Sequence, residues 1–277
     1  MTQNAIESKP AQAPMPEFRR PPVAEVVCGL TFKPLQMLLV PHIGLLWSKF
    51  RADYPSCKEV DALVPVVESF KEEDEQQMNF SLPALPRVWF ISKDNNGIIQ
   101  VQRDRYLQNW RKVRTTDEYP RYATVKSDFK QNIGRFQTFL NENELGTIQL
   151  EQLELTYINH IYQGEGWDDV GKLAKVFPDF AWRADKLFLT EPERINWRTS
   201  FVLPDQAGRM HVTIQNAMRR NDKKPLILFE LTVRGIGHER AIENIWGWFD
   251  LAREWIVRGF ADLTGPDMHK SVWLRTK

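Results

Sequence analysis

Alternating apolar and polar residues predict the strands of this chain, and apolar residues at every third or fourth position predict its helices. The first half opens with an apolar, β-branched strand at 23–32 and continues with a helix at 38–54. Pro41 falls in the first turn of this helix, where its missing N–H costs nothing. An irregular, proline-rich and acidic stretch follows, and an amphipathic helix at 122–143 closes the half.

A hairpin is predicted between these two helices. The runs at 87–92 and 98–113 flank the sequence Asp-Asn-Asn-Gly, and an Asn-Gly pair between alternating runs is a strong hairpin signal. The second run is too long for one strand. We therefore expect it to bend near Asp104 and to supply a third strand.

The second half repeats this order of elements. Its predicted elements are a strand at 150–162, a short helix at 166–177 capped by Asp168, a hairpin of 196–205 with 209–218, a strand at 226–235, and a long helix at 242–263 that ends at Gly265-Pro266.

The repetition indicates a duplicated β-α-β-β-β-α unit, although any α+β chain of this length alternates to some extent. One copy would occupy 21–146 and the other 147–277 of the same compact domain, after a disordered tail at 1–20. The predicted fold is α+β, with an antiparallel sheet and helices on one face, because each helix has one apolar stripe to bury. Helix-grip, TATA-binding and sliding-clamp folds have comparable arrangements, which imply no function.

Charge and composition narrow the class of protein. Lys plus Arg number 37 and Asp plus Glu 36, so the chain lacks the basic surplus that favours binding of nucleic acid. Two cysteines are too few for a disulfide framework, which favours the cytoplasm. The N-terminus has no signal-peptide pattern, and no run approaches about 18 apolar residues. We expect a cytoplasmic protein that does not associate with a membrane.

Motifs for metal or nucleophile chemistry are missing from the sequence. No HExxH, GxSxG or P-loop motif occurs. Cys28 falls on the apolar side of a strand and is expected in the core, whereas Cys57 follows Tyr54-Pro55 in a loop. None of the five histidines has a second histidine three or four positions along the chain. They are His42, His160, His211, His238 and His269. We expect no metal, no cofactor and no catalytic residue.

Two further patterns have alternative interpretations. The segment 164–171 (GEGWDDVG) resembles an anion-binding loop, but Asp168 and Asp169 oppose phosphate, so capping by Asp168 is preferred. Acids within apolar strands or helices are either acid–base groups or partners of arginines such as Arg253 or Arg258, and ion pairing is preferred. These acids are Glu25, Glu154, Glu230 and Glu254.

The segment 100–114 (QVQRDRYLQNWRKVR) is unusual because neither side of it is apolar. Treated as one strand, it places Arg103, Arg105, Leu107, Asn109 and Arg111 on one side and Gln102, Asp104, Tyr106, Gln108 and Trp110 on the other. It is either an edge or bent strand with snorkelling arginines or a surface that binds bases or a protein. The counterpart at 209–215 also has a polar side. The candidate binding residues are Arg103, Arg105, Trp110, Arg111, Arg209, His211 and Gln215.

Several phrases of the sequence resemble an uncharacterised family of bacterial proteins that is scattered sporadically among genomes. They are PPVAEVVCGL (21–30), PRVWFIS with IIQVQRDRYLQNWR (86–111), YPRY (119–122), LELTYINHI (153–161) and EWIVRGFADLT with a following MH (254–269). The resemblance implies a bacterial, stand-alone protein, and the sporadic distribution suggests genes of defence or toxin–antitoxin loci. It supplies no site residues, and the C-terminal SVWLRTK departs from the family pattern.

These observations favour a non-enzymatic binding protein that interacts with a protein partner or with itself, as an accessory component of a defence-type system. The alternatives are a nucleic-acid-binding protein that uses the Arg/aromatic surface and a small-ligand binder with a pocket between sheet and helices. Near-zero net charge disfavours the first alternative unless basic groups cluster.

Overall fold

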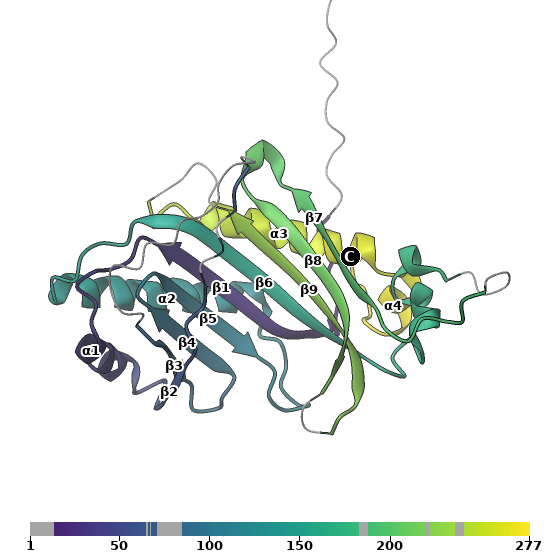
Figure 1. Ribbon diagram of the computed structural model, residues 1–277, viewed down its shortest axis with the longest axis horizontal. Coiled ribbons are helices and arrows are strands. Elements are labelled where there is room, and N and C mark those ends of the chain that lie inside the picture. Colours follow the sequence, from purple (N-terminus) through teal and green to yellow (C-terminus); the bar gives the residue numbers. More distant parts are fainter. Residues whose placement is uncertain are drawn as a thin grey trace, which may run out of the picture.

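The computed structural model describes residues 14–64, 66, 68–70, 85–182, 188–219, 222–235 and 241–277. Its centre is one antiparallel sheet of nine strands in the order β2-β3-β4-β5-β1-β6-β9-β8-β7 (Figure 1). The strands are β1 (Val23–Phe32), β2 (Ser56–Val60), β3 (Arg87–Ile91), β4 (Gly97–Gln102), β5 (Arg105–Arg111), β6 (Leu150–Tyr162), β7 (Asn196–Val202), β8 (Arg209–Met218) and β9 (Pro225–Gly235). The prediction of an antiparallel α+β fold is confirmed.

The strand order reads symmetrically from the centre of the sheet outward. β1 and β6 pair with each other, with Cys28 opposite Leu155. On the β1 side the strands run β5, β4, β3, and on the β6 side they run β9, β8, β7. β2 extends only the first side.

Two long helices pack on the same face of this sheet. α2 (Arg121–Glu142) contacts β1 and β5 through Phe136, whose ring lies 6.3 Å from Phe32 and 5.1 Å from Tyr106. α3 (Trp246–Leu263) covers β9 through Phe260, 5.7 Å from Phe229. Figure 1 shows the two helices along the back of the sheet. Burial of large aromatic rings on this face supplies the main stabilisation.

Shorter helices complete the fold at its two ends. α1 (Val40–Phe50) has Pro41 in its first turn, as predicted, and packs against α2 and β3. α4 (Pro266–Ser271) begins at the proline that was expected only to end the preceding helix. None of the helices in the described ranges is both long enough and apolar enough to cross a bilayer.

Four local predictions need correction. β2 lies within a stretch expected to be irregular. Residues 166–177 contain the 3-10 turn η1 (Val170–Lys175), not an α-helix, and a second 3-10 turn, η2 (Pro178–Phe180), follows. Asp168 does not cap η1; that position belongs to Asp169, which makes no cap hydrogen bond and pairs instead with Lys172 at 2.8 Å. The long helix starts at Trp246, not at residue 242.

The expected tail is also shorter than predicted. Phe18 is buried, and its ring lies 5.3 Å from Phe260 and 6.4 Å from Trp273. The backbone N–H groups of Arg19 and Arg20 donate to the carbonyls of Leu274 and Trp273, both at 3.0 Å. Residues 16–20 therefore belong to the folded core, and residues 1–13 lie outside the described part of the chain.

Candidate functional site

The sheet face opposite α2 and α3 is rich in polar and charged side chains. Strand register defines this face, because residues paired across neighbouring strands share a side and alternate residues point to the opposite one. We call it the polar face. Its polar members include Glu25, Arg87, Gln100, Gln102, Arg105, Asn109, Arg111, Gln152, Glu154, Thr156, Arg209, His211, Thr213, Gln215, Glu230, Thr232 and Arg234.

A hydrogen-bond relay orders the polar face in the first half. Gln100 Oε1 accepts from Arg87 Nη1 and Trp89 Nε1, both at 2.9 Å, and Gln100 Nε2 donates to Asn109 Oδ1 at 2.6 Å. Asn109 Nδ2 then donates to Glu25 Oε1 at 2.5 Å. Burial raises the pKa of the Glu25 carboxyl and nearby Glu230 raises it further, whereas Asn109 and the charge of Arg111 lower it. The relay fixes four strands relative to one another.

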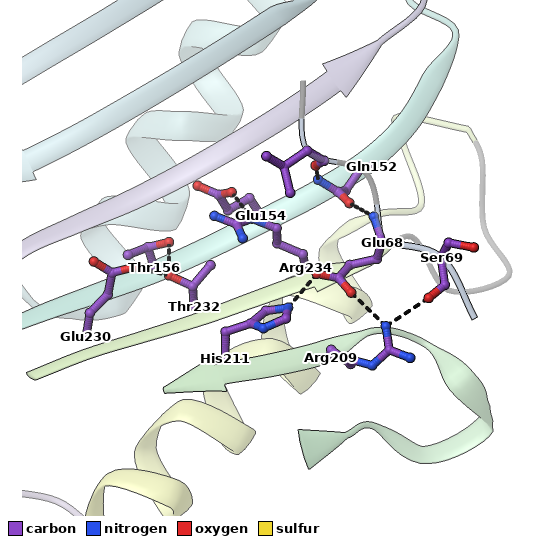
Figure 2. Close-up of polar contacts among 11 residues, drawn as sticks. Glu68, Ser69, Gln152, Glu154, Thr156, Arg209, His211, Glu230, Thr232 and Arg234 are labelled. Carbon is purple, nitrogen blue, oxygen red and sulfur yellow. Dashed lines mark hydrogen bonds and ion pairs between the residues drawn. The ribbon is translucent and has the colours of Figure 1, made fainter. Parts of the chain in front are cut away.

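The second half is ordered by an ion pair and a hydroxyl chain. Arg234 Nε lies 2.6 Å from Glu154 Oε2, and both side chains are about three-quarters buried. Thr232 Oγ1 donates to Glu230 Oε1 at 3.0 Å, so Thr156 must donate its own hydroxyl proton to Thr232, at 2.8 Å. Figure 2 shows these residues along β6 and β9.

A segment from outside the sheet crosses the polar face. We call the described residues Leu63, Val64, Val66 and Glu68–Phe70 the strap. Gln102 holds one end, because its Oε1 accepts from Leu63 N at 2.9 Å and its Nε2 donates to Leu63 O at 3.0 Å. Gln152 holds the other, accepting from Glu68 N and donating to Val66 O, both at 2.7 Å.

The strap places one carboxylate against two basic groups. Glu68 Oε2 lies 3.0 Å from Arg209 Nη1, and Glu68 Oε1 contacts His211 Nε2 (Figure 2). Arg209 Nη1 also donates to Ser69 O at 2.9 Å. Burial opposes ionisation of Glu68, but the hydrogen bonds and charges of His211 and Arg209 outweigh it, so its pKa lies below the ordinary value. The two basic side chains therefore favour the ionised form of this carboxylate, and we call Glu68, Arg209 and His211 the Glu68 cluster.

Two glycines position the basic side chains of the Glu68 cluster. A Cβ on Gly208 would lie 2.3 Å from Arg234 O, and one on Gly235 would lie 2.2 Å from Ala207 O. Only glycine therefore allows the turn before β8 to approach the end of β9 so closely. The close approach brings Arg209 and Arg234 to the same end of the polar face, opposite each other in register.

The structure places five of the seven candidate binding residues on the polar face and the other two elsewhere. Arg105, Arg111, Arg209, His211 and Gln215 lie on the polar face. Of these, Arg209 and His211 meet at Glu68, and Arg111 Nε donates to Asn95 O at 3.0 Å.

The other two candidates lie elsewhere. Arg103 occupies the tight turn between β4 and β5, where its Nε donates to Leu38 O at 3.3 Å. Trp110 points to the helix side, with its ring 5.5 Å from Tyr119. The bend expected near Asp104 is this turn, and it brings Gln102 opposite Arg105 on the polar face, not on the other side as a single strand required.

The buried acids and the thiols can also be placed. Cys57 is exposed in the edge strand β2, not in a loop as predicted. Glu154 and Glu254 form the expected ion pairs with arginine, Glu254 with Arg258 at 2.8 Å. Burial raises the pKa of Cys28 to about 12, so the thiol is protonated in the core, as its apolar side predicted. Within the described ranges, no three His, Cys, Asp or Glu residues gather as metal ligands.

In comparisons with known proteins, no protein-family model, curated protein or solved structure matches the chain.

Proposed function

We propose that this protein is a non-enzymatic binding protein whose polar face receives a protein partner. The observation that carries the proposal is the way this face holds a segment that is not part of the sheet. Amide side chains from β4 and β6 and basic side chains from β8 bind the main chain and a carboxylate of the strap. A surface equipped for these contacts suits a polypeptide ligand.

The charge of the polar face favours protein over nucleic acid. Arg209 and Arg234 are each paired with a carboxylate, and Glu25 and Glu230 are further acidic residues of the same face. A phosphate backbone laid across the sheet would meet these carboxylates, and its binding relies on unpaired basic groups. The near-neutral net charge of +1 agrees with this preference.

We further propose that the two halves derive from one β-α-β-β-β-α unit, with 3-10 turns in place of the first helix in the second half and β2 added to the first half. The support is the symmetric strand order about β1 and β6 and the matching places of α2 and α3. On this proposal the polar face is a single surface assembled from both copies, which explains why the strap contacts β4 and β8 together.

The test compares a substitution on the polar face with one on the helix side. Gln215→Arg adds bulk and charge to the polar face, and Gln131→Arg changes an exposed residue of α2. Tagged full-length chains are used as baits in bacterial cells, and co-purifying proteins are quantified by mass spectrometry. We expect the specific partner to fall at least ~10-fold with Gln215→Arg and to be retained with Gln131→Arg.

Direct binding then separates the classes of partner. The purified partner should bind the wild-type chain and the Gln131→Arg chain equally, with melting temperatures of both variants near that of the wild type. If instead only single-stranded DNA or duplex RNA binds, with affinity that falls steeply with salt, the protein-partner proposal is wrong.

A further inference from the structure

The strap is held by its main chain in a way that does not depend on most of its side chains. Gln102 and Gln152 each accept from a strap N–H and donate to a strap carbonyl. They stand on β4 and β6, three strand spacings or roughly 14 Å apart. The described residues Leu63 and Glu68 are thereby bound by strands that lie three spacings apart in the sheet.

At the end of the strap, side-chain contacts add to those of the main chain. The Glu68 side chain is 9% exposed between Arg209 and His211. The guanidinium of Arg209 also lies 4.4 Å from the centre of the Phe70 ring. Charge-assisted hydrogen bonds are roughly twice as strong as neutral ones, so the carboxylate is the main specific contact.

Two apolar side chains of the strap are exposed to solvent. Val64 is 63% exposed and Val66 is 52% exposed. Burial of apolar surface is the dominant stabilising effect in folded chains, and these two residues forgo it. A different peptide that offers a main chain and a carboxylate would therefore make the same contacts as the strap.

We propose that the polar face binds an extended, acidic peptide segment of the protein partner, and that the strap is a tethered competitor occupying the same place. The inference rests on the proposed function and names the chemistry of the partner: an extended main chain bound by Gln102 and Gln152, followed by a Glu or Asp side chain bound by Arg209 and His211. Because the strap is tethered, it competes at an effective concentration in the ~mM range. Weakening the strap alone therefore raises affinity for a free peptide.

The experiment uses the full-length chain and a fluorescent synthetic peptide with the sequence of residues 61–70, DALVPVVESF. A second peptide carries Gln at the position of Glu68. Binding is measured by fluorescence anisotropy. We expect the Glu68→Gln chain to bind the first peptide at least ~10-fold more tightly than the wild-type chain, since only the tethered competitor has lost its charge-assisted contacts. The Gln peptide should bind this chain at least ~10-fold more weakly.

Two further variants guard against effects on folding. Phe70→Ala removes an exposed ring from the tethered strap alone and should raise affinity for the peptide by about 3-fold, the size of an exposed cation–π contact. The combination of Arg209→Met with His211→Asn, placed in the Glu68→Gln chain, should abolish binding. Thermal melts identify any variant that fails to fold, and Phe70→Ala keeps the test valid if Glu68→Gln does.

Several results would overturn the inference. They are equal affinity of wild-type and strap variants for the peptide, equal affinity for the Glu and Gln peptides, or binding of nucleic acid in place of peptide by the Glu68→Gln chain. If the peptides fail to bind while Gln215→Arg still removes a co-purifying protein, the inference is wrong and the proposed function stands. If that protein is retained as well, both are wrong.

Discussion

Replacing Gln100 by Met tests whether the relay on the polar face is structural, and its cost can be worked from the contacts. The substitution removes three hydrogen bonds while keeping a side chain of similar volume. Asn109 is buried, so its stranded carbonyl costs about 1–3 kcal/mol, and the half-buried donors of Arg87 and Trp89 lose about 1 kcal/mol each. A gain of about 1 kcal/mol from the more apolar side chain offsets part of this. The free energy of unfolding should fall by about 2–4 kcal/mol.

Guanidinium unfolding, followed by circular dichroism and by fluorescence of the ten tryptophans, measures this loss. Gln131→Met on the exposed side of α2 is the matched control and should change stability by less than about 0.5 kcal/mol. In a double-mutant cycle with Trp89→Phe, the coupling energy should be about 1 kcal/mol, since the pair shares one hydrogen bond. A loss no larger than the control's would refute the reasoning, because the amide would then have no structural partner.

Three further changes probe other parts of the molecule. Phe18→Ala should lower the free energy of unfolding by about 3–5 kcal/mol in chemical denaturation, because its ring packs between α3 and the C-terminal residues. Tyr106→Phe should raise it by about 1 kcal/mol, because the buried hydroxyl has no hydrogen-bond partner among the described residues; a loss of stability would contradict this. Burial raises the folded-state pKa of Glu25 above the ordinary 4.5, so its favourable contribution is complete below about pH 4.5 and is lost as the pH rises through the raised value. Denaturation at several pH values should therefore show the free energy of unfolding of Glu25→Gln rising relative to that of the wild type from pH 4.5 to 7. A difference that stays constant over this range would refute the prediction.

The central strands β1 and β6 were predictable because the residue types that indicate a buried strand lie within each strand itself. The ranges 23–32 and 150–162 coincide with β1 and β6, where β-branched and aromatic residues mark buried strands. β2 was missed because four of its five residues are exposed, so an edge strand of this kind has no apolar side. Residues 16–20 were missed because a single phenylalanine buried against the distant C-terminal residues gives no periodic pattern.

The polar face was only half predictable. Alternation placed Arg105 and Arg111 together correctly, and the polar side of 209–215 indicated Arg209 and His211. The same rule misplaced Gln102, because the turn at residues 103 and 104 reverses the chain and starts the alternation again. The alternation of Gln152, Glu154 and Thr156 with apolar residues was the available signal for the β6 part of the face.

Glu68 could not have been found from the sequence. It lies in the proline-rich, acidic stretch, and its partners Arg209 and His211 are 141 and 143 residues away. No spacing rule relates positions so distant, because the sheet order alone brings β8 and the strap together. Its lowered pKa is likewise a property of the assembled Glu68 cluster and not of the local sequence.

The central position of β1 has a consequence for synthesis of the chain. Leu30 pairs with Tyr106 and with Leu153, which follow it by 76 and 123 residues. At roughly 5–20 residues per second, the ribosome needs about 6–25 s after Leu30 to produce its partner in β6. Both edges of this apolar strand are unpaired until β5 is made, and one edge stays unpaired until β6 emerges, an arrangement that promotes aggregation. The nascent chain, before β6 emerges, is therefore the stage at which a chaperone would matter most to this protein.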